Sequence, residues 1–169
     1  YEQFLDFHRK YYHPSNSYIY LYGNMDMEEK LRFLDEQYLS HYEQLSVDSR
    51  IAYQKPFDKP VENVLEYPIM EEEPEEENAY LSYHAVVGTD LDPELYIAMQ
   101  VLEYVLLGAP GAPLKQALLD KKIGKDIYGG YSNGILQPYF SVIAKGTDYS
   151  KKEAFVQAIE QTLEELVSK

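Results

Sequence analysis

The prediction of the fold starts from one run in the second half of the chain, Leu106-Leu107-Gly108-Ala109-Pro110-Gly111-Ala112-Pro113-Leu114. Glycine is the usual residue just beyond the C-terminus of a helix, and proline is tolerated at the first position of one. Gly108 therefore predicts the end of one helix and Pro113 the start of the next. Helix capping alone accounts for both residues. The alternative is that the loop contacts a substrate through Gly108, Pro110, Gly111 and Leu114.

Upstream of this run, Asp92-Pro93 is a helix start, with a capping carboxylate followed by proline. The helix expected over residues 94–107 is apolar on most sides, so we predict that it is well buried. Before it, residues 79–87 alternate as a strand with Tyr80, Ser82 and His84 on one face, and residues 61–70 predict another strand.

Downstream, the second helix is expected to end at residue 121 or 122. A short extended piece among four glycines follows it, and then a strand over residues 137–144. Ser150 and Glu153 have the spacing of a capping box, which predicts the start of an amphipathic helix over residues 152–167.

The first part of the chain predicts a helix over residues 1–12, a strand over 18–22 and a helix over 26–42, the last capped by Asp26. Residues 44–60, which contain two prolines, indicate a linker. Strands that follow one another directly, interspersed with helices, favour an α+β fold. We expect an antiparallel sheet with helices packed on one face.

Composition limits the partners. There are 15 Lys and Arg against 29 Asp and Glu, for a net charge of −14. Such a surface repels nucleic-acid phosphates and anionic lipid, so we expect no nucleic-acid or membrane partner. It would attract basic peptides, although many acidic proteins are merely soluble. The absence of cysteine excludes disulfides and thiolate metal ligands.

Catalytic motifs are absent from the sequence. The four histidines, His8, His13, His41 and His84, include no pair four residues apart, the spacing that lets two ligands share one helical face. His84 is instead expected to be a strand residue near the core. No Gly-x-Ser-x-Gly elbow is present either. The sequence therefore predicts no catalytic residue and no metal ligand, and we expect the isolated chain to be inactive and free of stoichiometric zinc.

Two blocks of sequence nevertheless resemble a known family. The first is Phe7-x-x-x-Tyr11-Tyr12-His13-Pro14-Ser15-Asn16-Ser17-Tyr18-Ile19-Tyr20-Leu21-Tyr22-Gly23-Asn24-Met25-Asp26. The second comprises the run quoted at the start and its continuation through Gly134-Ile135-Leu136-Gln137-Pro138-Tyr139-Phe140. In this order they are similar to the insulinase-type (pitrilysin-type) zinc metallopeptidases of family M16, and within it to subfamily C, the presequence proteases.

The resemblance implies parts of domains with the LuxS/M16 metallohydrolase fold. Residues 1–43 would be the C-terminal tail of the first, catalytic domain, 44–60 a linker, and 61–169 the N-terminal part of the second, non-metal domain. The family is a four-domain clamshell in which an inverted His-x-x-Glu-His motif holds zinc. None of the ligands matches this sequence, so zinc would belong to the parent protein and not to this segment.

The implied function is an internal segment of a zinc-dependent metalloendopeptidase that degrades unfolded peptides in a closed chamber. The segment would supply chamber wall, with the loop at Gly108 as a substrate contact. Its partners would be peptides, with basic ones suited to the charge, and the remaining domains of the same polypeptide. We expect a cytoplasmic location. The alternative is an M16-like structural or interaction subunit without catalysis.

Overall fold

The computed structural model describes residues 1–168 and divides the chain into two compact units, residues 1–53 and 54–169. The division between Tyr53 and Gln54 falls within the expected linker, residues 44–60. The assignment of the two parts to successive domains of a larger protein stays a prediction.

The first unit is helical. It contains α1 (Glu2–Tyr11), the 3₁₀ turn η1 (Pro14–Asn16), α2 (Met27–Gln37) and the 3₁₀ turn η2 (Leu39–His41). The expected cap of α2 is confirmed, since the Asp26 side chain accepts the N–H of Glu29 at 3.0 Å. The chain after η2 returns to η1, where the Leu45 N–H donates to Ser15 Oγ at 3.0 Å.

Two strands expected from the sequence do not form. Residues 18–22 and 61–70 are extended without ladder pairing, and Tyr18 and Tyr20 are exposed. Their composition favours strands, but a strand exists only where its backbone groups meet those of a neighbour. Within residues 1–168 neither segment has such a neighbour, so these two predictions are wrong for the chain as it stands.

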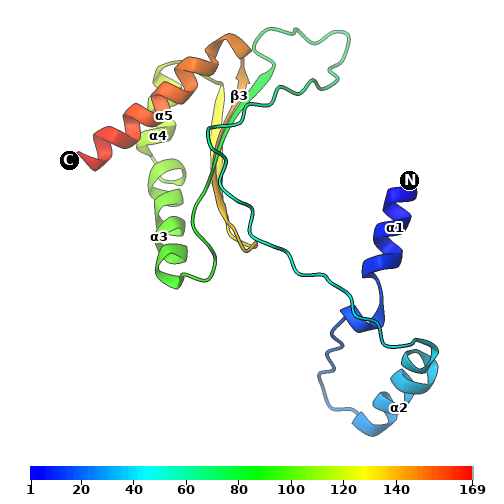
Figure 1. Cartoon of the computed structure of the whole chain (residues 1–169). Coiled ribbons are helices and arrows are strands. Elements are labelled where there is room, and N and C mark those ends of the chain that lie inside the picture. The colour runs from blue at the N-terminus through cyan, green and yellow to red at the C-terminus, as the bar shows by residue number, and fades with distance from the viewer. Residues whose placement is uncertain (169) are drawn as a thin grey trace. The chain divides into compact units, whose positions relative to one another are not determined.

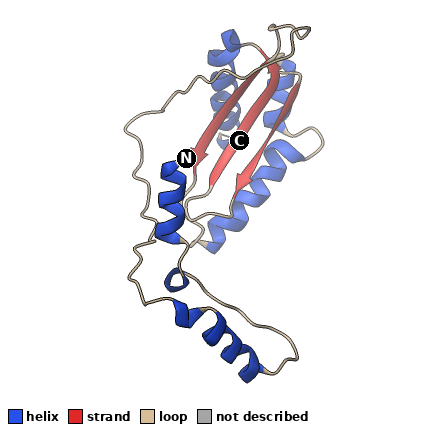
Figure 2. Cartoon of the chain, turned by 90° about the vertical axis from the view of Figure 1, so that its right-hand side faces the viewer, coloured by secondary structure: helices blue, strands red, loops and turns tan. Residues whose placement is uncertain are grey.

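The second unit contains a three-stranded antiparallel sheet made of β1 (Ala79–Val86), β2 (Asp126–Ser132) and β3 (Tyr139–Thr147). The strand order is β1-β3-β2, so β3 is central and β2 has one ladder neighbour among the described residues. Figure 2 shows the three strands in front and the helices behind them. The predicted α+β class, with an antiparallel sheet and helices on one face, is confirmed.

The helices of this unit all lie on the same side of the sheet (Figure 1). They are α3 (Pro93–Glu103), the π-helical turn η3 (Tyr104–Gly108), α4 (Pro113–Asp120), the 3₁₀ turn η4 (Tyr149–Lys151) and α5 (Lys152–Val167). Gly108 ends one helix and Pro113 begins the next, as predicted. The capping box expected at Ser150 is wrong, because Lys151 precedes α5 and no side chain caps it.

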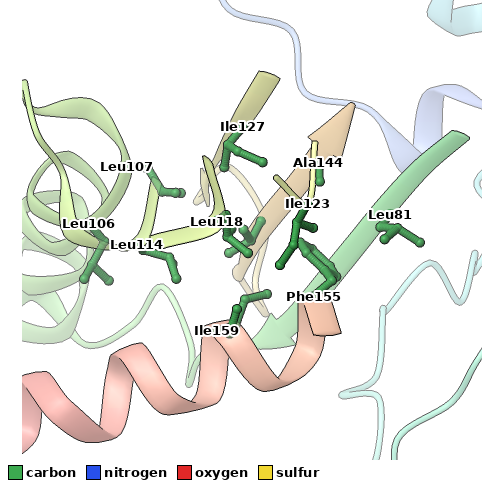
Figure 3. Close-up of a cluster of buried hydrophobic side chains, with 12 residues drawn as sticks. Leu81, Leu106, Leu107, Leu114, Leu118, Ile123, Ile127, Ala144, Phe155 and Ile159 are labelled. Carbon is green, nitrogen blue, oxygen red and sulfur yellow. The ribbon is translucent and has the colours of Figure 1, made fainter. Parts of the chain in front are cut away.

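The core lies between the sheet and these helices (Figure 3). Phe155 and Ile159 of α5 pack with Leu114 and Leu118 of α4, and each of the four is at most 1% exposed. The strands contribute Leu81, Ile127, Val142 and Ala144. Deep burial of apolar side chains from both layers stabilises the packing by about 1.5–3 kcal/mol for each large one.

Helix α3 departs from expectation, because none of its residues is buried. Apolar side chains of α3 and η3 that remain exposed are Ile97, Val101, Leu102, Tyr104 and Val105. An apolar outer face of this kind is typical of a helix that packs against further polypeptide. By length and composition, the helical stretch Pro93–Asp120 could also cross a membrane. Its buried leucines, however, belong to the core, and core helices meet the same criteria.

Candidate functional site: a groove along the free edge of strand β2

A hollow of the second unit lies between the free edge of β2 and the α3–η3 helix. Its volume is about 580 Å³. Its lining combines the helical residues Gln100, Glu103, Tyr104, Leu107, Gly108 and Lys115 with Ile127, Tyr128, Gly129, Tyr131 and Asn133 from the strand and the turn beyond it. We call this hollow the β2 groove.

Strand β2 directs some of its backbone groups away from β3, toward this groove. The Tyr131 N–H donates to Glu103 Oε2 at 3.1 Å, so it points away from β3. Along an antiparallel strand, residues two apart direct their backbone groups to the same side. The backbone groups of Gly129 therefore point to the free edge as well, and such an edge is a template for another extended chain.

Two consecutive glycines leave room for close approach to this part of β2. A Cβ at Gly129 would overlap the carbonyl of Ser141 on β3 and lie 3.0 Å from Leu107 Cδ1. A Cβ at Gly130 would come within 3.1 Å of Glu103 Oε1. Glycine in the interior of a strand marks close backbone approach, and here it lets β3, η3 and the Glu103 carboxylate all approach the strand closely.

A second, smaller hollow of about 310 Å³ follows the loop from Leu107 to Ala112. It shares Leu107, Gly108 and Lys115 with the β2 groove, so the two hollows are adjacent. Gly111 has φ +71, and a Cβ added there would have no atom within 4 Å. Its left-handed backbone conformation therefore requires glycine, because space alone would allow a side chain.

The four residues expected to contact a substrate have different surroundings. Gly108 lines both hollows, and Pro110 and Gly111 line the smaller one. Leu114 is 1% exposed and packs in the core, so its side chain does not reach the loop surface. The structure thus brings the glycines and Pro110 together and assigns Leu114 to packing. Contact of this loop with a substrate stays a prediction.

The groove contains two charged side chains, Glu103 and Lys115, and is also lined by Tyr131, whose hydroxyl is buried. Lys115 Nζ lies 3.9 Å from Asp126 Oδ1. Tyr131 is 7% exposed, and its hydroxyl has no hydrogen-bond partner among residues 1–168. Burial raises the pKa of Tyr131, and the negative charge of Asp90 raises it further. The hydroxyl therefore keeps its proton well above neutral pH.

The residues that the structure describes do not fit zinc. Within residues 1–168 no group of three or more His, Asp or Glu side chains converges as a metal site would require. His8 stacks on Tyr12, and His13 accepts the Ser15 N–H and lies edge-on to Tyr42, so both histidines have structural contacts. The position expected for His84 near the core is wrong, because its side chain lies on the exposed face of β1.

Sequence reasoning missed Glu103, Gln100 and Tyr131 as groove residues. Glu103 and Tyr131 are 28 positions apart, and only the packing of α3 beside β2 brings them together. The pair Gly129-Gly130 was the available signal, because adjacent glycines inside a strand pattern indicate close approach to a backbone or ligand.

Comparison with known proteins matches the whole chain, residues 1–169, to the family described as Peptidase M16 inactive domain. Protein HypA of Clostridium perfringens is 43% identical over 167 residues, which are 99% of this chain and 17% of that protein. Presequence protease 1, chloroplastic/mitochondrial, of Arabidopsis thaliana is 34% identical over 98% of this chain and 16% of its own length. The mitochondrial presequence protease of Danio rerio is 26% identical over 99% and 17%. The chain thus spans 16–17% of the length of these relatives.

Proposed function

This chain belongs to the M16 peptidase family, in the presequence-protease branch, and from this premise we propose that it forms part of the wall of a peptide-degrading chamber. The parent protein would be a zinc-dependent metalloendopeptidase that cleaves unfolded peptides. The role of this segment would be to hold the peptide in the β2 groove. The observation that carries the proposal is the free edge of β2, bordered by Gly129 and flanked by an open hollow.

The dimensions and chemistry of the groove suit an extended peptide. A volume of about 580 Å³ is within the range of small-ligand sites, which run from about 300 to 1,000 Å³. An extended chain beside β2 would hydrogen-bond through its own backbone to the outward N–H and C=O groups of Gly129, whereas the Tyr131 N–H is already bonded to Glu103. Backbone pairing of this kind tolerates many sequences, as a peptidase that degrades varied peptides requires.

Charge and the apolar outer face of α3 suggest two kinds of partner. The net charge of −14 favours basic peptides as substrates. The exposed apolar side chains of α3 and η3 would pack against other domains of the same polypeptide, which removes them from water. Because residues 1–168 do not fit zinc, the zinc of the parent and its ligands would lie in those other domains.

A groove-filling variant of the full-length protein tests the proposal. Gln100 is exposed on the groove side of α3, so Gln100→Trp adds bulk to the groove without entering the core. We expect KM for an unstructured peptide to rise by about tenfold, equivalent to about 1.4 kcal/mol, with kcat little changed. The matched control is Gln157→Trp, at an exposed position of α5 outside the groove.

An unchanged KM in Gln100→Trp, with the control also unchanged, would contradict the groove as a peptide site. The same preparation distinguishes the alternative, a noncatalytic M16-like subunit. Peptide cleavage by the full-length protein that a chelator abolishes supports the peptidase. Absence of any cleavage, together with retained peptide binding, supports the interaction subunit.

A further inference from the structure

Glu103 has an unusual environment for a carboxylate. It is the last residue of α3, is partly buried, and accepts the Tyr131 N–H through Oε2. Its other oxygen, Oε1, lies beside Gly130. An ionised carboxylate offers roughly four acceptor positions. The Tyr131 N–H is the single hydrogen bond that the described residues donate to it, so most of its acceptor capacity remains available within the groove.

No cation of the described residues neutralises this carboxylate. Lys115, the other charged residue of the groove, has Asp126 as its ion-pair partner, and none of the ion pairs within residues 1–168 includes Glu103. A partly buried carboxylate without a counterion is costly, and a cation brought to it by a ligand recovers that cost.

We propose that Glu103 is a specificity-determining residue, which binds a cationic group of a peptide held in the β2 groove. The cation is an ammonium or guanidinium group, supplied by a Lys or Arg side chain or by the N-terminus of the peptide. The proposal rests on the proposed function and deepens it, because it names the residue that selects among peptides. The hydrogen bond from Tyr131 fixes the carboxylate at the strand edge, where a paired peptide would pass.

The test uses the full-length protein with Glu103→Gln. The amide oxygen of glutamine still accepts the Tyr131 N–H, so the variant removes the charge and retains the anchoring hydrogen bond. The matched control is Glu160→Gln, at an exposed position of α5 outside the groove. The probes are one unstructured peptide in four forms, with a lysine or an acetyl-lysine at one site and with a free or an acetylated N-terminus.

We expect the unmodified protein to bind the cationic forms more tightly, and Glu103→Gln to raise their Kd and KM about tenfold while the doubly acetylated peptide is unaffected. Loss of preference for lysine identifies the side chain as the cation, and loss of preference for the free amine identifies the N-terminus. An equal effect of Glu103→Gln on all four peptides, or no effect on any, overturns the assignment of Glu103.

Gln100→Trp separates this failure from failure of the proposed function. If Gln100→Trp weakens all four peptides and Glu103→Gln changes no charge preference, the groove binds peptide and only the role of Glu103 is refuted. If Gln100→Trp leaves every Kd unchanged, the groove is not the peptide site, and both proposals are overturned.

Discussion

Substitution of Gly129 by alanine tests how closely the strands approach in the sheet. The added Cβ would overlap the Ser141 carbonyl and lie 2.8 Å from the Ser141 carbonyl carbon. Ordinary carbon contacts are about 3.5–4.0 Å, so β3 would have to retreat by at least about 0.7 Å, and by more to relieve the overlap with the carbonyl oxygen. Such a retreat lengthens a ladder hydrogen bond from about 2.9 Å to about 3.6 Å, at which distance it is lost.

The energetic cost follows from these shifts. Loss of two ladder hydrogen bonds costs about 2 kcal/mol. Overpacking against Leu107, whose Cδ1 would be 3.0 Å away, adds about 1–3 kcal/mol. The expected total of about 3–5 kcal/mol is a large part of the stability of a domain. In the full-length protein, the β2 and β3 amides of Gly129→Ala should exchange hydrogen faster than those of the unmodified protein. The increase in exchange rate measures the loss of stability.

The control for this variant is Gly134→Ala. A Cβ at Gly134 meets no atom within 4 Å, so the substitution should leave exchange in the sheet unchanged. Equal protection in Gly129→Ala and Gly134→Ala would refute the reasoning, because it would mean that the strands do not approach as closely as the geometry requires.

Two further predictions concern a helix cap and an ion pair. Asp92→Ala removes the acceptor of the Glu94 and Leu95 N–H groups and should destabilise the start of α3 by about 1 kcal/mol. Hydrogen exchange of the first-turn amides measures this loss. Asp92→Ser, which keeps a side-chain acceptor, should retain most of the stability. Hydrogen bonds from Lys152 and, to a smaller extent, Tyr149 lower the pKa of Glu62 below 4.5. The contact therefore stabilises the fold at neutral pH. This stabilisation is lost as the pH falls through the lowered pKa of Glu62 in the folded protein. A ¹³C titration of the Glu62 carboxyl should show a midpoint below 4.5 that rises in Lys152→Gln; an unchanged midpoint would contradict the pairing.

Local sequence was sufficient where a structure depends on near neighbours. The caps at Asp26 and Asp92, the break between Gly108 and Pro113, and the alternation of β1 all depend on contacts within a few residues. Each was predictable from backbone geometry. The α+β class followed as well, because the order of helices and strands limits how their apolar faces can be covered.

Pairing and burial were not predictable in the same way. Residues 18–22 have the composition of a strand, yet no described segment pairs with them, and α3 has the composition of a core helix, yet its outer face is exposed. Both depend on what other polypeptide lies alongside, and this information is not contained in the local pattern.

The sequence by itself determined the elements that short-range geometry controls, the α+β class, the acidic charge and the absence of a zinc motif. The tertiary structure alone decided that β2 is an edge strand, that Leu114 belongs to the core, and that Glu103 lies against the backbone of Tyr131. The physical reason is that a groove consists of groups distant in sequence, whose approach is set by packing of the helices on the sheet.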